Sequence, residues 1–434
     1  MNNVKIVPST LNGEITIPPS KSMSHRAIIC ASFSEGISEI HNIALSDDII
    51  ATLDAMKSIG VEILDIQQDT STGTNKVIVR GTRNFEVKNE IIDCKESGST
   101  IRFLIPIVTL TNDKITVTGR GRLVERPLDT YYNIFDKQQL KYTNNNGKLP
   151  LTLEGKIQSG IFEIEGDVSS QFITGLLFTL PVLDEDSKII ITTELESKGY
   201  VDLTIDILQK FGIEIINNNY REFIIKGNQT YKSRDYKVEG DYSQAAFWIV
   251  AGTLVGGIKC KDLDISSLQG DKAVIDIVRE MGGNISEYED GIEVKASKTK
   301  GVVIDASQCP DIIPVLSVLA SLSEGTTKII NGKRLRIKES DRLTSTATEL
   351  NKLGADIEEL EDGLIIKGKD KLKGGVTVDS WNDHRIAMAL GIASIKCEES
   401  IVITNSNSVT KSYPNFWDDF KKLGGNIDEW SMGK

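Results

Sequence analysis

The sequence contains few of the residues from which metal sites and disulfide networks are built. Only three histidines occur among 434 residues, which leaves little material for a His-based metal site. The cysteines are odd in number and scattered, and no two of them have the Cys-x-x-Cys spacing. We therefore expect neither disulfides nor a structural zinc site, and no bound metal. The five cysteines are Cys30, Cys94, Cys260, Cys309 and Cys397.

Long apolar runs and an excess of positive charge are also missing. No apolar stretch reaches membrane-spanning length, and the opening MNNVKIVPST lacks the charged start and apolar core of a signal peptide. We expect a cytoplasmic protein without a membrane partner. The formal net charge of −12 argues against nucleic-acid binding, which needs a basic face. A local cluster of Lys and Arg would still permit a small anionic substrate.

What the sequence does contain is a repeated pattern. The length suggests two domains, and the hydrophobic fraction of 39% is that of an ordinary globular protein. The segments ASFSEGISEI, from residue 31, and ASLSEGTTKI, from residue 320, belong to two of six copies spaced about 70 residues apart. Each copy is expected to run strand, helix, strand, helix, hairpin, with the second helix ending at Gly or a near equivalent. This alternation predicts an α/β fold with parallel or mixed sheets, which by itself could be only a scaffold.

Polar residues gather at the junction before the first helix of each copy. We expect all six junctions to place Ser, Thr, Asp or Asn at the N-cap, and three also carry Arg26, Arg102 or Arg385. A cation there is unfavourable to the helix macrodipole, so its repetition indicates that an anion binds. Further basic residues lie on the links before the second helices: Arg126, Lys338, Arg342 and Lys411. Singly each could be a surface charge, but as a set they predict a multi-anion pocket between two repeat domains.

Several motifs resemble those of one enzyme family, in the correct order over nearly the whole chain. They are PSKSMSHRA, SGSTIRFL, GDVSSQ, ESKGYVD, CPDIIP, RIKESDR, DHRIAMA and KSYPNF. Together they are similar to the EPSP synthases, the 3-phosphoshikimate 1-carboxyvinyltransferases. The resemblance implies transfer of the enolpyruvyl group of phosphoenolpyruvate to the 5-hydroxyl of shikimate 3-phosphate, on the route to chorismate and aromatic amino acids. It also implies a monomeric enzyme without a metal or organic cofactor.

The fold implied by this resemblance is an inside-out α/β barrel with two domains that close on substrate. Each domain would hold three βαβαββ units, in agreement with the six copies. We expect residues 21–237 to form one domain and residues 1–20 with 238–434 to form the other. The two crossings, near Pro19–Ser20 and Glu239–Gly240, would then act as hinges.

The resemblance also assigns roles to residues that match the family's motifs. The implied catalytic residues are Lys21, Asp311 and Glu339. We favour Asp311 as the base toward the 5-hydroxyl and Glu339 with Lys21 for the proton at C3, although the sequence does not divide these steps. The implied contacts of shikimate 3-phosphate are Lys21, Ser22, Arg26, Ser169, Ser170, Gln171, Ser197, Tyr200, Asp311 and Lys338. Those of phosphoenolpyruvate are Lys21, Gly98, Arg126, Gln171, Glu339, Arg342, Arg385 and Lys411.

Three positions depart from the family's pattern. Arg334 stands where some members carry Asn, Gln244 replaces the second serine of the usual GDxSSAAF junction, and Phe103 replaces a proline. Gly98 matches the position where a methyl group would crowd the inhibitor glyphosate. We therefore expect glyphosate to inhibit this protein.

Other interpretations of the same residues stay open. Asp311 could be only an N-cap, Ser169 and Ser170 plain helix-start serines, and Glu339 with Asp341 a solvated capping stretch. Four more residues are expected to orient or pack rather than react: His25, His384, Tyr413 and Trp417. The rival enzyme is the sister transferase that acts on UDP-N-acetylglucosamine. That enzyme carries a reactive cysteine after its second junction, where this chain reads TNDKITVTGRGRLVERPL. A non-catalytic repeat protein is the rival from another class, but it predicts no gathering of cations and carboxylates at the junctions.

Overall fold

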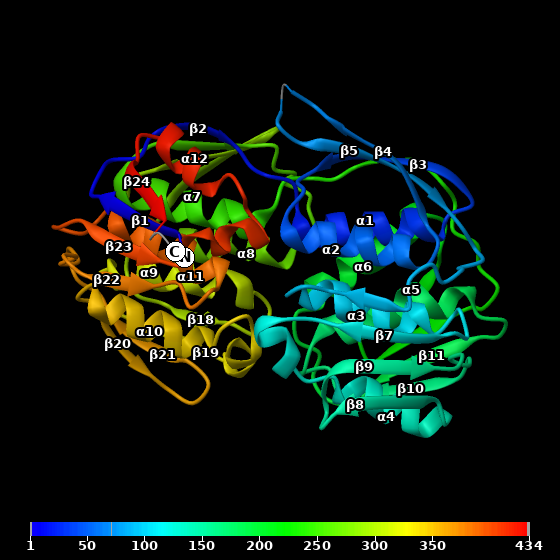
Figure 1. Cartoon of the computed structure of the whole chain (residues 1–434). Helices are drawn as coiled ribbons and strands as arrows, with labels where there is room; N and C mark the ends of the chain where they lie inside the picture. Colours follow the sequence, from blue (N-terminus) through cyan, green and yellow to red (C-terminus); the bar gives the residue numbers. More distant parts are fainter. Residues whose placement is uncertain (1, 71, 432–434) are drawn as a thin grey trace. The chain divides into compact units, whose positions relative to one another are not determined.

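The computed structural model describes residues 2–70 and 72–431, and the chain forms two compact units. One unit is Pro19–Val238, and the other combines Met1–Pro18 with Glu239–Lys434. Each unit is built from three repeats of the same kind (Figure 1). The assignment of residues 21–237, and of residues 1–20 with 238–434, as the two transferase domains stays a prediction.

Six four-stranded sheets occur in the described part of the chain, and all have the same topology. In the clearest repeat the order is β6 (Ile91–Asp93), α3 (Gly98–Val108), β7 (Lys114–Thr118), α4 (Asp129–Gln138), β8 (Lys141–Asn145) and β9 (Lys148–Glu154). Its strands are ordered β6-β7-β9-β8, with β6 parallel to β7 and the remaining pairs antiparallel. The predicted unit of strand, helix, strand, helix and hairpin is therefore confirmed, as is the α/β fold with six βαβαββ repeats.

The other repeats of the unit Pro19–Val238 differ in how the first strand is supplied. One contains α1 (Lys21–Phe33), β3 (Gly36–Ile43), α2 (Asp47–Ser58), β4 (Glu62–Gln68) and β5 (Asn75–Gly81). Its first strand, β14 (Asp235–Lys237), comes from the end of the unit and pairs in parallel with β3. The last repeat contains β10 (Ile161–Ile164), α5 (Ser170–Thr179), β11 (Ser187–Ile191), α6 (Lys198–Lys210), β12 (Ile215–Asn218) and β13 (Glu222–Ile225).

The second unit is closed by the N-terminal strands. β2 (Gly13–Thr16) pairs with β15 in the repeat α7 (Tyr242–Val255), β15 (Ile258–Lys261), α8 (Ala273–Glu280), β16 (Asn284–Tyr288) and β17 (Gly291–Lys295). The next repeat is β18 (Val303–Asp305), α9 (Ile313–Ser321), β19 (Thr326–Ile330), α10 (Arg342–Lys352), β20 (Asp356–Glu359) and β21 (Leu364–Lys367). The last is β22 (Thr377–Asp379), α11 (His384–Ser394), β23 (Ile401–Thr404), α12 (Phe416–Lys422) and β24 (Asn426–Ser431), completed by β1 (Asn2–Val7). Short 3₁₀ turns precede several second helices, and they include η1 (Gly121–Glu125), η5 (Lys333–Ile337) and η6 (Ser406–Lys411).

The first and second helices of each repeat differ in burial. Every residue of α9 and of α11 is buried, as expected for sequences that are apolar on all sides. The second helices, such as α6, bury only one face. Each second helix is followed or ended by a residue in the left-handed conformation, as predicted: Gly60, Gln139, Gly212, Gly282, Gly354 and Gly424. The helix starts that carry the polar junctions are thus anchored in each unit's core.

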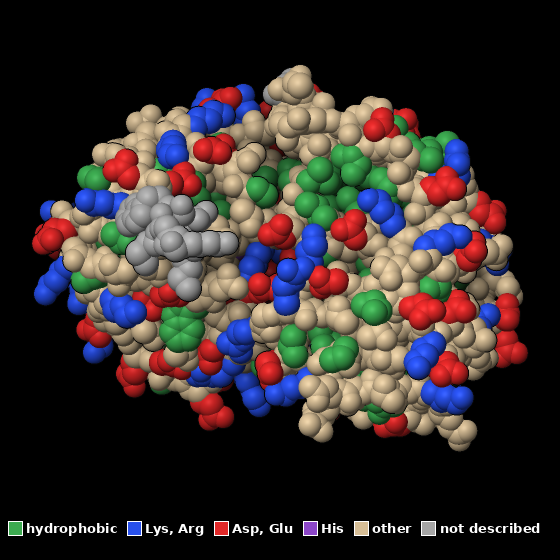
Figure 2. Space-filling model, viewed as in Figure 1, with side chains coloured by type: hydrophobic (Ala, Val, Ile, Leu, Met, Phe, Trp, Pro, Cys, Tyr) green, Lys and Arg blue, Asp and Glu red, His purple; other side chains and the backbone are tan. Residues whose placement is uncertain are grey.

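The visible face of the molecule is mixed in charge. On the face shown in Figure 2, acidic and basic side chains alternate over both units. Within residues 2–70 and 72–431, no helix combines the length and the apolar character needed to cross a membrane.

Candidate active site

The unit Pro19–Val238 holds its predicted site residues at the starts of buried helices. Ser20 caps α1 by accepting a hydrogen bond from the backbone N–H of Met23 (3.4 Å). Lys21 is the first residue of this helix, and its Nζ lies 2.7 Å from Oδ2 of Asp48 on α2. Ser22 follows, and its carbonyl accepts a hydrogen bond from Arg26 (2.8 Å).

Arg26 is buried among neutral oxygen atoms. Its Nε donates to the hydroxyl of Thr204 (2.9 Å), and Nη2 donates to the carbonyl of Tyr200 (3.0 Å). The ring of Phe103 lies 5.3 Å from the guanidinium carbon. Burial lowers the pKa of Arg26 to about 10. No carboxylate of the described chain is among its hydrogen-bond partners, so a charge is held here at an energetic cost.

Gly98 and Arg126 are adjacent in space. Gly98 opens α3 after the N-cap Ser97, and Arg126 directly follows η1. A Cβ atom built on Gly98 would lie 2.3 Å from Nη1 of Arg126. Glycine at this position therefore leaves room for the guanidinium group.

Gln171, at the start of α5, is fixed by two residues of α3. Its Oε1 accepts from Nη1 of Arg102 (2.9 Å), and its Nε2 donates to the hydroxyl of Ser99 (2.9 Å). Arg102 also lies over the ring of Phe172, 4.8 Å from the centroid. The side chain of Gln171 is therefore held in one orientation.

Serines form the rest of this group. Ser169 caps α5 by accepting from the N–H of Gln171 (3.3 Å), and Ser170 follows it in a buried position. Ser197, at the start of α6, is buried with a left-handed φ of 54° and does not cap its helix through its side chain. A non-glycine residue with positive φ is uncommon and is concentrated at functional sites.

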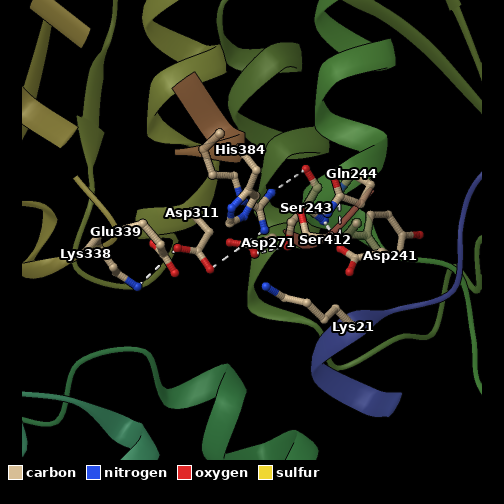
Figure 3. A network of polar contacts seen from close by, with 12 residues as sticks. Lys21, Asp241, Ser243, Gln244, Asp271, Asp311, Lys338, Glu339, His384 and Ser412 are labelled. Carbon is tan, nitrogen blue, oxygen red and sulfur yellow. Dashed lines mark hydrogen bonds and ion pairs between the residues drawn. The ribbon is translucent and has the colours of Figure 1, made fainter. Parts of the chain in front are cut away.

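The second unit gathers carboxylates around one arginine. Arg342, the first residue of α10, donates from Nη1 to Oδ1 of Asp311 (2.8 Å) and from Nη2 to Oε2 of Glu339 (2.7 Å). Its Nε donates to Oδ2 of Asp383 (2.9 Å). Burial alone would lower the pKa of Arg342, but the three carboxylates raise it instead. Asp311 also accepts from Nζ of Lys338 (3.1 Å), as Figure 3 shows.

Two further cations belong to the same group. Nη2 of Arg385 lies 3.9 Å from Oδ2 of Asp311, and its Nη1 donates to the carbonyl of Ser243 (3.0 Å). Lys411, at the end of η6, donates from Nζ to the carbonyl of Asn382 (2.6 Å). Lysine and arginine gathered in this way neutralise phosphate and carboxylate groups.

The charges around Asp311 and Lys338 shift the pKa values of both side chains. Burial would raise the pKa of Asp311, but the charges of Lys338, Arg342 and Arg385 outweigh burial and hold the pKa well below its ordinary value. Burial lowers the pKa of Lys338, and the charges of Arg342 and Arg334 add to this, against the opposing effects of Asp311 and Glu339. Asp311 is therefore an ionised carboxylate at neutral pH, held by groups that also suit an anionic ligand.

The chain is similar to known proteins in sequence and in fold. The family described as EPSP synthase (3-phosphoshikimate 1-carboxyvinyltransferase) matches residues 6–420. The chain belongs to this family. A 3-phosphoshikimate 1-carboxyvinyltransferase of Clostridium novyi (strain NT) is 65% identical over 436 residues, covering 100% of both chains. The solved EPSP synthase of Acinetobacter baumannii has a TM-score of 0.83 at 24% identity and covers 99% of this chain and 100% of its own. The enolpyruvyl transferase NikO of Streptomyces tendae shares the fold at a TM-score of 0.80 and 16% identity, over 100% of this chain and 99% of its own.

One expected helix cap is wrong. Five junctions place Ser20, Ser97, Ser169, Asp241 and Asp383 at N-caps whose side chains accept backbone hydrogen bonds. Asp311 does not cap α9, because it lies inside the short 3₁₀ turn η4 (Pro310–Ile312), and α9 begins at Ile313 without a side-chain cap. Pro314 lacks the N–H that a cap at Asp311 would bind three residues on, and Pro310 suits the first position of η4. The carboxylate of Asp311 faces cations instead.

The interpretation of RIKESDR as a capping stretch holds for Asp341 but not for Glu339. Asp341 caps α10 by accepting from the N–H of Thr344 (3.2 Å), whereas Glu339 pairs with Arg342.

His25 packs in the core of its unit. Its pKa lies well below its ordinary value, mainly because the ring is buried and also because Lys21 and Arg26 are positively charged.

Two of the residues that depart from the family's pattern lie in the second unit. Gln244 donates from Nε2 to the hydroxyl of Ser412 (3.3 Å), and Arg334 is buried near Lys338. Tyr413 and Trp417 are buried in the aromatic packing around Phe416, as expected.

Sequence reasoning missed the partners that fix the predicted residues. These are Asp48 beside Lys21, Arg102 and Ser99 beside Gln171, and Asp383 beside Arg342. A signal was available for three of them, since Ser99 and Arg102 lie inside SGSTIRFL and Asp383 lies inside DHRIAMA. Asp48, the second residue of α2, lies outside every motif named above.

Proposed function

We propose that this protein transfers the enolpyruvyl group of phosphoenolpyruvate to the 5-hydroxyl of shikimate 3-phosphate, releasing phosphate. The observation that carries this proposal is the pair of carboxylates, Asp311 and Glu339, held by one arginine among further cations. Addition requires loss of the hydroxyl proton and gain of a proton at C3 of phosphoenolpyruvate. Elimination then removes a C3 proton as phosphate leaves. Such a sequence needs at least two groups that move protons, together with cations that neutralise phosphate and carboxylate.

We propose that Asp311 accepts the hydroxyl proton. Its low pKa makes it a weak base in the free protein. Substrate anions that bind Lys338, Arg342 and Arg385 would cancel the charges that depress this pKa. The pKa of Asp311 would then rise towards the operating pH, which favours proton transfer.

Glu339 and Lys21 are the proposed groups for the C3 proton. Each is held by a partner of opposite charge, Arg342 at 2.7 Å from Glu339 and Asp48 at 2.7 Å from Lys21. Both groups therefore have a fixed orientation, which proton transfer at a defined carbon requires.

The remaining residues are proposed substrate contacts. For shikimate 3-phosphate they are mainly hydroxyl groups and cations, which suit a phosphate and a hydroxylated ring, together with one amide and one carboxylate: Lys21, Ser22, Arg26, Ser169, Ser170, Gln171, Ser197, Tyr200, Asp311 and Lys338. For phosphoenolpyruvate they are Lys21, Gly98, Arg126, Gln171, Glu339, Arg342, Arg385 and Lys411.

The deciding test is phosphate release from phosphoenolpyruvate by the purified protein, with shikimate 3-phosphate or UDP-N-acetylglucosamine as acceptor. We expect release only with shikimate 3-phosphate. Release only with the sugar nucleotide would assign the chain to the sister reaction, and silence with both would mean that family membership no longer brings activity. We further propose a monomer located in the cytoplasm, which sedimentation and cell fractionation would test.

A further inference from the structure

The loop before α11 contains two consecutive residues in the left-handed conformation. Trp381 has φ 55° and Asn382 has φ 53°. Asparagine tolerates this conformation, but a bulky residue such as tryptophan rarely adopts it. Such a backbone persists only where its surroundings hold it.

Trp381 is held from two sides. Its backbone N–H donates to Oδ1 of Asp379 (2.5 Å), and its indole Nε1 donates to Oε1 of Glu349 on α10 (2.8 Å). The other oxygen of Glu349 accepts from the N–H of Asp379 (3.0 Å). Glu349 is 1% exposed, whereas Trp381 is 37% exposed. A buried carboxylate therefore holds the exposed loop through hydrogen bonds. Lys352 balances the charge of Glu349 from the solvent side (2.9 Å).

The same loop continues into the proposed phosphoenolpyruvate contacts. The carbonyl of Asn382 accepts from Nζ of Lys411 (2.6 Å), and Asp383 accepts from Nε of Arg342 (2.9 Å). Glu349 lies seven residues after Arg342, about two helical turns, so both face the loop from one side of α10. This helix therefore holds the loop at two points, one through Asp383 and one through Trp381.

We propose that Trp381 and Glu349 are positioning residues that fix the carbonyl of Asn382 and, through it, the ammonium group of Lys411. Neither residue acts on the substrate itself. The inference rests on the proposed function, because it takes Lys411 as a contact of phosphoenolpyruvate.

The first test replaces the indole donor and keeps an aromatic ring. Trp381→Phe should raise KM for phosphoenolpyruvate about tenfold, with KM for shikimate 3-phosphate and kcat unchanged within about twofold. Glu349→Gln removes the charge but keeps one acceptor oxygen, so a smaller rise is expected. Because both changes act on the same hydrogen bond, the double variant should be less impaired than the product of the single effects.

A second measurement does not depend on activity. Acetylation of the substrate-free protein by acetic anhydride, followed by peptide mass spectrometry, reports how freely Lys411 reacts. Trp381→Phe should speed the labelling of Lys411 and leave that of Lys338 unchanged. Lys352→Gln is the matched control, since it removes the cation beside Glu349 without touching the loop. It should change neither the labelling nor either KM.

Several outcomes would overturn the proposal. One is unchanged labelling of Lys411 in folded Trp381→Phe protein. Another is an equal rise of both KM values together with a lower melting temperature, which would mark general structural support. If Trp381→Phe does not fold, Glu349→Gln gives the same decision. If the wild-type protein releases no phosphate, the proposed function fails while the labelling still decides whether Trp381 positions Lys411.

Discussion

Arg26 and Arg342 are both buried arginines near helix starts, one in each unit, but they have opposite electrostatic surroundings. Arg26 lies in the first helix of its repeat and Arg342 begins the second helix of its repeat, and each is 2% exposed. Arg26 donates to hydroxyl and carbonyl oxygens, and burial lowers its pKa to about 10. Arg342 binds three carboxylates, which raise its pKa against the effect of burial.

The difference shows that burial alone does not decide what a cation can do. The three carboxylates Asp311, Glu339 and Asp383 are balanced by the three cations that pair with them, Lys338, Arg342 and Arg385. The group's further cation, Lys411, adds one positive charge. Arg26 has no such compensation within the described chain. Under the proposed function, Arg26 would offer its uncompensated charge to a substrate anion, whereas Asp311 and Glu339 beside Arg342 would move protons.

The largest effect is expected from the carboxylate that would act as base. Asp311→Asn should lower kcat by at least about a hundredfold, because the amide cannot accept the hydroxyl proton. Phosphate release under saturating substrates measures it. Asp341→Asn is a matched control, since Asp341 caps α10 and asparagine caps equally well. Near-normal kcat in Asp311→Asn would remove Asp311 from the proton-transfer step.

The contrast between the two arginines can be tested by replacing each of them and comparing the losses of unfolding free energy. Arg342→Met leaves three carboxylates without their shared cation and should cost about 3–5 kcal/mol of unfolding free energy. Arg26→Met removes a cation that has only neutral partners and should cost about 1–2 kcal/mol, from lost hydrogen bonds. Urea unfolding of both proteins gives the values. Equal losses would mean that the two settings are energetically alike.

The cations around Asp311 should also make the stability of the fold depend on pH. The pKa of Asp311 is lower in the folded protein than in the unfolded chain, so its ionised form stabilises the fold above the unfolded pKa of about 4. This contribution is lost as the pH falls from about 4 towards the folded pKa. The stability difference between wild type and Asp311→Asn should therefore be constant above about pH 5 and shrink below pH 4. Urea titrations from about pH 3 to pH 7 measure it, and a difference independent of pH would contradict the ionised state of Asp311.

How much the sequence could predict depended on whether the signal was local. Helix starts and the left-handed residues after second helices follow from neighbouring residues, and so does the repeat topology. The pairs Lys21–Asp48 and Arg342–Asp383 join residues 27 and 41 positions apart, and no local pattern marks them. Asp311 does not cap α9 for a local reason, because Pro314 offers no N–H three residues after it.

Gly98 tests the contacts of the first unit with a change of one methyl group. In Gly98→Ala the new Cβ would displace the guanidinium of Arg126 rather than the backbone, so the fold should lose little stability. We expect KM for phosphoenolpyruvate to rise about tenfold. We also expect glyphosate to inhibit the variant less strongly than the wild-type protein. Gly257→Ala is the control, because a Cβ there meets no atom within 4 Å. If the wild-type protein resists millimolar glyphosate, the part of this prediction that concerns the inhibitor is wrong, and the KM for phosphoenolpyruvate still tests the rest.

The smallest effect is expected at Phe103, which replaces the family's proline. Its ring lies 5.3 Å from the guanidinium carbon of Arg26 and offers the uncompensated cation an electron-rich face. Such contacts contribute about 0.5–2 kcal/mol when the cation is desolvated. Phe103→Leu keeps an apolar side chain but removes that face, so KM for shikimate 3-phosphate should rise a few-fold while KM for phosphoenolpyruvate does not. A change confined to phosphoenolpyruvate would mean that Phe103 acts through Gly98 at the start of the same helix instead of through Arg26.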